Sequence, residues 1–108
     1  MDFNAYQNAA RKTALYADAY RVTYPALGLA SEAGEVAGKV KKVLRDRGGD
    51  FSEDQIAAIG DELGDVLWYV ATLAADLGLP LNEIASHNIE KLQSRLDRGT
   101  LQGDGDVR

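Results

Sequence analysis

Two short segments of the sequence carry acidic residues at the same spacing. Glu32 and Glu35 lie three residues apart, and Glu62 and Asp65 repeat that spacing further along the chain. Residues three apart in a helix are neighbours on one face, so each pair sets two carboxylates side by side. Carboxylates held close together either raise their pKa values or bind a cation. The spacing therefore indicates a cation site, provided that the two helices pack against each other.

The residue types favour a hard divalent cation. If the two helices pack antiparallel, four carboxylates converge, and oxygen ligands suit Mg²⁺ or Mn²⁺. The chain has no cysteine and one histidine, so it offers little to zinc. A simpler alternative stays open at this point. In this alternative, Glu35 pairs with Lys39 four residues later, and the acids form an ordinary solvated surface without a cation.

A glycine precedes the second acid of each pair. A glycine in a helix interior costs about 1 kcal/mol relative to alanine, so Gly34 and Gly64 need a reason. Together with Gly38 and Gly60 they lie in rows of small residues, and such rows let helices approach closely. Because the apolar stripes already provide one packing surface, this second surface predicts a homodimer or a dimer of dimers, with both helices at the interface.

Helical periodicity runs along most of the chain, and no segment alternates as a strand does. We expect helices over about 2–20, 26–45, 53–77 and 82–96, with Asp2 or Asn4, Ser52 and Asn82 as N-caps. The break before the second helix is expected at Pro25, since the residue before a proline avoids the helical region. The prediction is an all-α, four-helix bundle with the second and third helices forming its core, over residues 1–97. Residues 98–108 are expected to be a flexible tail.

The third predicted helix has the most regular apolar pattern and should be central. Its stripe consists of Ile56, Ile59, Leu63, Val66, Leu67, Val70, Leu73, Ala74 and Leu77.

Composition excludes several classes of protein. Seventeen acids against twelve bases give a net charge of −5, which disfavours a nucleic-acid partner because such binding rests on phosphate neutralisation. The absence of cysteine excludes a disulfide scaffold and suits the cytoplasm. The longest apolar run, "VLWYVATLAA", is about half a membrane span, and the start of the chain lacks signal-peptide features. We therefore expect a cytoplasmic protein without a membrane partner.

The sequence resembles the all-α nucleoside triphosphate pyrophosphohydrolases of the MazG-like family over about residues 24–98. The resemblance rests on Glu32-x-x-Glu35 followed by Glu62-x-x-Asp65, and on "LGLASEAGEVAGKVKKVLRD", "DELGDVLWYVATLAADLGL" and "NIEKLQSR". Many members begin the first motif with two acids, whereas Ser31 precedes Glu32 here. This departure leaves the number of metal ions open.

The resemblance implies hydrolysis of a (d)NTP between the α and β phosphates to a (d)NMP and pyrophosphate, in the clearance of unwanted nucleotides. It implies Mg²⁺, with Mn²⁺ as a substitute, held by Glu32, Glu35, Glu62 and Asp65. One of these four acids, Glu35 or Glu32, would orient or deprotonate the attacking water in place of binding the metal. The implied substrate-binding residues are Lys39, Lys42, Tyr69, Asn88, Lys91 and Arg95, with Tyr6, Tyr20 and Tyr24 as possible stacking partners for the base.

Other functions remain open on the sequence alone. Within the enzyme class they are a narrower dUTP or dCTP pyrophosphatase and a phosphoribosyl-ATP pyrophosphatase relative. Outside it, the chain would be a non-enzymatic helical interaction module in which the glycine rows serve only association.

Overall fold

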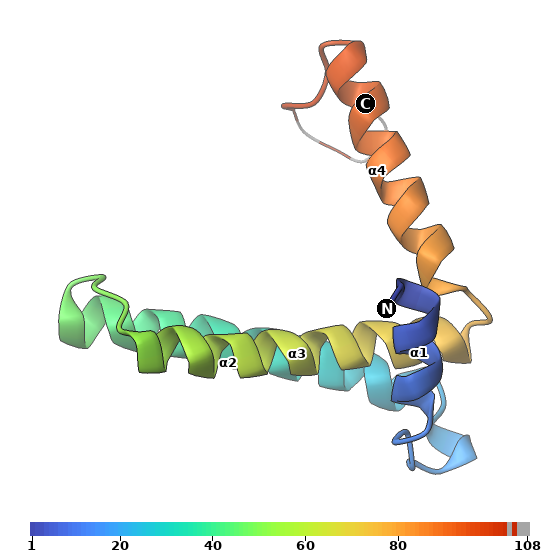
Figure 1. The fold of residues 1–108 in the computed structure, drawn as a ribbon, viewed down its shortest axis with the longest axis horizontal. Coiled ribbons are helices and arrows are strands. Elements are labelled where there is room, and N and C mark those ends of the chain that lie inside the picture. The colour runs from blue at the N-terminus through green and yellow to red at the C-terminus, as the bar shows by residue number, and fades with distance from the viewer. Residues whose placement is uncertain (104, 106–108) are drawn as a thin grey trace.

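The computed structural model describes residues 1–103 and 105, and every regular element in this part of the chain is helical. The elements are α1 (Phe3–Arg11), a short 3₁₀ helix η1 (Asp18–Tyr20), α2 (Thr23–Arg47), α3 (Glu53–Asp76) and α4 (Leu81–Asp97). Figure 1 shows α2 and α3 as a long antiparallel hairpin, α1 against one end of it, and α4 pointing away from it. The predicted all-α fold with four α-helices is confirmed.

The hairpin connection follows ordinary capping rules. Gly48 ends α2 in the left-handed conformation with φ of 59°, and its N–H donates to the Val43 carbonyl. Ser52 begins α3 with a capping box, in which its side chain accepts from the Gln55 N–H and the Gln55 side chain accepts from the Ser52 N–H. The predicted N-cap at Ser52 is confirmed.

The first helix is shorter than expected. α1 ends at Arg11 rather than near Tyr20. The hydroxyl of Thr13 accepts from the Trp68 indole N–H at 2.8 Å, and the Tyr16 hydroxyl donates to Asp76 at 2.7 Å. These contacts hold the chain after α1 against α3 in a path that a continuous helix does not follow.

Two predicted helix starts are wrong. α2 begins at Thr23, because Pro25 lies in its first turn, where a backbone N–H has no partner within the helix. α4 begins at Leu81, so Asn82 lies inside the helix rather than at its cap. The Asn82 side chain accepts instead from the Asn4 N–H at 3.0 Å. The Asn4 side chain in turn accepts from the Asn82 N–H at 2.9 Å, and this pair of hydrogen bonds ties α1 to α4.

The core of the described chain is small. Its buried apolar residues are Ala10, Val43, Ala71, Ala74 and Leu81. Gln7 is buried where α1, α3 and the start of α4 meet. Its amide nitrogen donates to the carbonyls of Ala71 and Leu79, and its oxygen accepts from the Leu81 N–H. Gln7 thus satisfies three backbone polar groups at this junction, beside the apolar cluster of Ala10, Ala71 and Leu81.

Much of the predicted apolar stripe of α3 is exposed within a single chain. α3 contacts each of the other three α-helices, and its most extensive partner is α2. The stripe is covered near Ala71 and Ala74, but Ile56 is 59% exposed, Leu63 54% and Leu77 53%. The prediction of a continuous buried stripe is wrong for these three residues within one chain. Ile56 and Leu63 lie in the N-terminal half of α3, which α1 does not reach, and Leu77 lies just after the helix ends.

The predicted tail begins with an ordered turn. Gly99 has a φ of 71°, and the Thr100 N–H donates to the Arg95 carbonyl at 2.8 Å. Residues 104 and 106–108 of that predicted tail lie outside the described residues. Among the described helices, none is both long and apolar enough to cross a membrane.

Candidate metal centre

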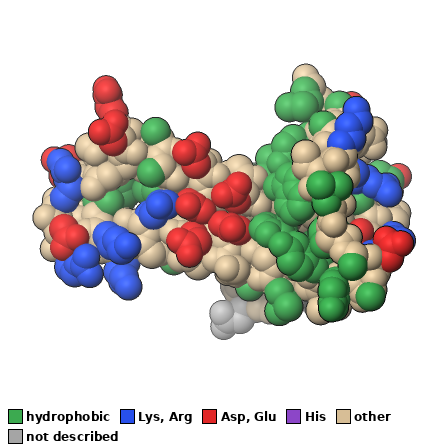
Figure 2. All heavy atoms as spheres, turned by 90° about the horizontal axis from the view of Figure 1, so that it is seen from below, with side chains coloured by type: hydrophobic (Ala, Val, Ile, Leu, Met, Phe, Trp, Pro, Cys, Tyr) green, Lys and Arg blue, Asp and Glu red, His purple; other side chains and the backbone are tan. Residues whose placement is uncertain are grey.

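Three of the four predicted metal ligands meet between α2 and α3. Glu32 comes from α2, whereas Glu62 and Asp65 come from α3, and each offers a carboxylate oxygen within 4.8 Å of the other two. The antiparallel hairpin causes this meeting, because it sets the middle of α2 beside the middle of α3. Figure 2 shows acidic side chains gathered in the middle of this face.

Glu35, the fourth predicted ligand, stands apart from this group. Its side chain is exposed and is not one of the three that converge. Its negative charge still contributes to the electrostatics of Glu32. Its role as a ligand or as the residue that handles water stays a prediction.

The electrostatics of the three-acid cluster fit a cation. The pKa of Glu32 lies above its ordinary value of 4.5, first because its carboxyl shares a hydrogen bond with Glu62. Partial desolvation and the charges of Asp65, Glu62 and Glu35 raise it further. A divalent cation among these oxygens would neutralise the repulsion that favours the protonated form, so the donor set suits Mg²⁺ or Mn²⁺.

Basic side chains lie on one side of the acids, toward the hairpin loop. The Lys39 ammonium is 3.6 Å from a Glu62 carboxylate oxygen. Lys39 and Lys42 line a cavity of about 240 Å³, whose walls also include Val43 and Ile59. Of the two predicted phosphate contacts, Lys39 therefore lies next to the acids, and Lys42 lies with Lys39 on the wall of the cavity.

Aromatic side chains lie on the other side of the acids. Tyr24 and Tyr69 have ring centroids 6.2 Å apart, and Tyr16 stacks on Tyr24 at 5.0 Å. The pKa of Tyr69 is raised, first by a hydrogen bond with Tyr24, then by burial and by negative groups that include Glu32 and Asp65. The row of Tyr69, Tyr24 and Tyr16 thus begins at the carboxylates and leads away from them.

The α4 residues predicted to bind substrate do not reach this cluster in one chain. Figure 1 shows α4 leaving the hairpin near its α1 end and running away from it. Asn88 and Lys91 are exposed on α4, whereas Arg95 is only 5% exposed. Their role as substrate contacts stays a prediction.

Sequence reasoning missed two residues at the aromatic end. A side chain at Gly28 would overlap the ring of Tyr69, so this glycine allows Tyr69 to lie against α2. By contrast, a Cβ added at Gly34 or Gly64 meets nothing within 4 Å, so any close contact there has to come from another molecule. The second missed residue is Asp76. Its signal was an acid in the last turn of α3, where the helix dipole disfavours negative charge.

Comparison with known proteins now gives the family. The model of the MazG nucleotide pyrophosphohydrolase domain matches residues 24–99, which include all four predicted acids and Tyr69. The chain belongs to the MazG nucleotide pyrophosphohydrolase family. It is also similar to the Gene 37 protein of Mycobacterium phage L5, with 46% identity over 114 residues that cover all of both chains. No solved structure matches the chain.

The MazG match has a clear boundary on the structure. It covers α2 from its second residue, together with α3 and α4, and leaves out α1, η1, Val22 and Thr23. The family therefore accounts for the carboxylate cluster and its nearest neighbours. The segment that carries Tyr16 has to be interpreted from its own contacts.

Proposed function

We propose that this MazG-family chain is a Mg²⁺-dependent nucleoside triphosphate pyrophosphohydrolase that converts a (d)NTP to a (d)NMP and pyrophosphate. The observation that carries the proposal is the convergence of Glu32, Glu62 and Asp65 from two antiparallel helices inside the MazG match. Clearance of unwanted nucleotides in the cytoplasm, with Mn²⁺ as a substitute metal, belongs to the same proposal.

The three converging acids would hold the cation, and Glu35 beside them would orient or deprotonate the attacking water. A bound Mg²⁺ supplies charge neutralisation on the phosphates and lowers the pKa of bound water. The exposure of Glu35 at the edge of the cluster suits a residue that handles water rather than one that is enclosed by ligands. Glu32 is the other candidate for this role, because its carboxylate lies within the cluster and shares a hydrogen bond with Glu62.

The order of groups along the hairpin suggests how a nucleotide lies there. Lys39 and Lys42 on one side of the acids suit the β and γ phosphates. Tyr69 and Tyr24 on the other side suit the sugar and base, since aromatic rings stack on bases. Figure 2 shows basic side chains among some acidic ones toward one end, acidic side chains gathered in the middle, and mainly apolar side chains toward the other end. The scissile bond would then lie over the acids.

The decisive experiment is a screen of dNTPs and NTPs with Mg²⁺ for release of pyrophosphate. The Glu62→Gln variant keeps the side-chain shape and removes a carboxylate, so we expect turnover to fall at least about a hundredfold. Glu90→Gln on exposed α4 is the matched control and should retain turnover. No pyrophosphate from any nucleotide would overturn the proposal and favour the non-enzymatic interaction module.

The same screen separates the narrower enzymes. Release confined to dUTP or dCTP would identify a dedicated pyrophosphatase, and phosphoribosyl-ATP would be tested as a further substrate. The base preference follows from which rate is highest.

We further propose that the protein works as a homodimer or a dimer of dimers. The accessible surface of the chain is 7584 Å², whereas a compact monomer of 11.7 kDa exposes about 5,900 Å². The difference of roughly 1,700 Å² is what each subunit of a permanent dimer buries. The radius of gyration, 16.7 Å, also exceeds the roughly 13 Å of a compact domain of this length.

The exposed apolar residues indicate where the second copy would bind. Leu44 of α2, Ile56 and Leu63 of α3, and Ile89 and Leu96 of α4 are each more than half exposed. These side chains lie on the hairpin and on the diverging α4, the two parts of the chain that have little cover of their own. A second copy of the same chain carries both surfaces, so a two-fold dimer lets each cover the other.

A further inference from the structure

The residue before α2 has a strained backbone. Val22 has φ of 67° and ψ of −55°, and it is the only non-glycine residue with positive φ in the described part of the chain. The Thr23 N–H donates to the Arg21 carbonyl at 2.7 Å, which closes a three-residue turn around Val22. Such a turn is rare, and a β-branched side chain makes it more costly. Something in the structure must hold it.

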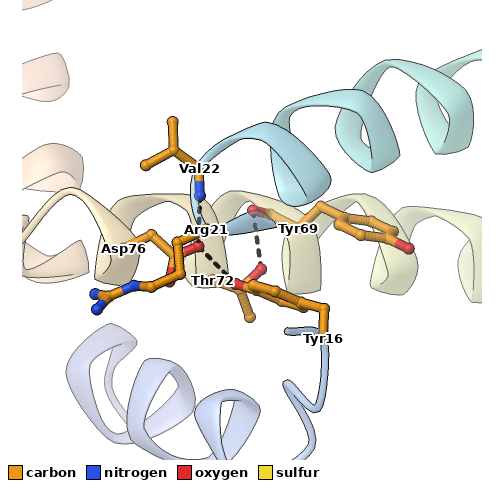
Figure 3. A network of polar contacts seen from close by, with 6 residues as sticks. All are labelled: Tyr16, Arg21, Val22, Tyr69, Thr72 and Asp76. Atoms are coloured by element: carbon orange, nitrogen blue, oxygen red, sulfur yellow. Dashed lines mark hydrogen bonds and ion pairs between the residues drawn. The ribbon is translucent and has the colours of Figure 1, made fainter. Parts of the chain in front are cut away.

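The carboxylate of Asp76 holds this turn. It accepts from the Val22 N–H at 2.9 Å and from the Tyr16 hydroxyl at 2.7 Å, and the Arg21 guanidinium lies 3.7 Å away. Figure 3 shows these groups arranged around Asp76. The carboxylate is mostly buried, with 13% of the side chain exposed. These donors compensate for placing an acid at the end of α3, where the helix dipole opposes it.

The two groups held by Asp76 lead to the aromatic side of the site. Val22 immediately precedes α2, and Tyr24 lies in the first turn of that helix. The Tyr16 ring stacks on Tyr24, whose ring in turn faces Tyr69. Asp76 thus fixes Tyr24 from two directions, through the backbone at Val22 and through the ring of Tyr16.

A contact with the metal does not explain Asp76. It lies eleven residues after Asp65 on the same helix, which corresponds to roughly 16 Å along the axis. An unstrained helix start would use a serine, threonine, aspartate or asparagine as its cap, whereas Val22 provides no side-chain cap. The strained turn persists beside a candidate binding surface, which is where such strain is characteristically retained.

We propose that Asp76 is a positioning residue for the nucleoside part of the substrate. By holding the Val22 turn and Tyr16, it sets Tyr24 and Tyr69 at the aromatic end of the carboxylate cluster. The inference rests on the proposed function, because it assigns that end to the sugar and base. It assigns no role to Asp76 in binding phosphate.

The test compares a ligand that has a nucleoside with one that lacks it. Trp68 is the only tryptophan and meets the Tyr69 ring edge-on at a centroid distance of 5.0 Å, so its fluorescence reports changes at Tyr69. The full-length protein is titrated, with Mg²⁺ present, with each common 2′-deoxynucleoside monophosphate and separately with inorganic pyrophosphate. Circular dichroism of each variant measures retained helix.

For Asp76→Ala we expect the Kd of the best monophosphate to rise about fivefold or more, as loss of one aromatic stacking contact would cause. The Kd of pyrophosphate should stay unchanged. In turnover assays, KM for the triphosphate should rise while kcat stays nearly constant. Asp76→Asn keeps one acceptor, so its Kd for the monophosphate should lie between that of the unaltered protein and that of Asp76→Ala.

Tyr16→Phe keeps the ring and loses only the hydroxyl, so it provides a milder variant that tests the same contact if Asp76→Ala does not fold. It should weaken monophosphate binding in the same direction. Asp18→Ala removes a nearby exposed acid and serves as the matched control. Unchanged monophosphate binding in both variants would overturn the inference, as would equal weakening of both ligands. Absence of pyrophosphate release by the unaltered protein would instead overturn the proposed function, while the fluorescence comparison would still test Asp76.

Discussion

Glu62 is the residue at which the charges of the candidate site meet. Its carboxyl shares a hydrogen bond with Glu32, and the Lys39 ammonium lies 3.6 Å from it. Lys39 neutralises part of the negative charge on one side, whereas Glu32 and Asp65 add to it on the other. The pKa of Glu32 is raised first by its hydrogen bond with Glu62, then by partial desolvation and by the neighbouring negative charges, and a cation would stabilise the ionised cluster.

The raised pKa of Glu32 predicts how stability changes with pH and metal. The folded chain binds this proton more tightly than the unfolded chain does, so the contribution is full below about pH 4.5 and is lost as pH rises through the folded pKa. Mg²⁺ binds the ionised form, so its stabilising effect should grow with pH over the same range. Thermal denaturation at several pH values, with and without Mg²⁺, measures both effects.

Glu32→Gln provides the comparison for this prediction, because it removes the titrating proton and one oxygen ligand. The variant should lose the pH dependence attributed to Glu32 and show a smaller shift with Mg²⁺ or Mn²⁺. A metal-induced shift of equal size in both proteins and at all pH values would contradict a metal site at Glu32.

At the scale of elements, α2 depends on a glycine at one contact with α3. A methyl group at Gly28 would overlap the Tyr69 ring, so the Gly28→Ala variant must displace that ring. We expect weaker nucleotide binding with helix content retained, because alanine itself favours the helix by up to about 1 kcal/mol. Fluorescence titration with a deoxynucleoside monophosphate and circular dichroism measure the two effects.

Gly38→Ala is the matched control on the same helix. A Cβ at Gly38 meets nothing within 4 Å, so this variant should bind nucleotide normally. If Gly28→Ala bound nucleotide as well as Gly38→Ala does, the position of Tyr69 would not matter for binding.

At the scale of the whole molecule, the single chain leaves large apolar side chains exposed on the hairpin and on α4, which is the basis of the proposed self-association. Light scattering of the unaltered protein should give a mass of twice 11.7 kDa, or four times that mass for a dimer of dimers. Ile56→Glu places a charge on the exposed apolar surface and should reduce the mass to that of one chain. An acid in the first turns of α3 suits the helix dipole, so the helix itself should persist.

Leu15→Glu is the control for this mass measurement. Leu15 is 88% exposed in the connection after α1, which is not part of the hairpin or of α4, so its replacement should leave the mass unchanged. A single-chain mass for the unaltered protein at micromolar concentration would contradict self-association.

The helices and the acid pairs followed from sequence because their causes are local. Helical periodicity, the Ser52 cap and the glycines at the end of α2 act within a few residues. The i,i+3 spacing placed Glu62 and Asp65 on one face of α3, and an antiparallel hairpin was enough to bring Glu32 to them.

The remaining features depend on residues far apart in the chain. α1 ends early because Trp68 and Asp76 hold the segment after it, and Val22 takes its strained conformation against that same carboxylate. The periodicity of α3 marked its apolar residues but could not show that α1 covers only half of them. A local pattern determines which face of a helix is apolar, whereas the tertiary structure decides what covers that face, because cover is provided by distant segments or by another molecule.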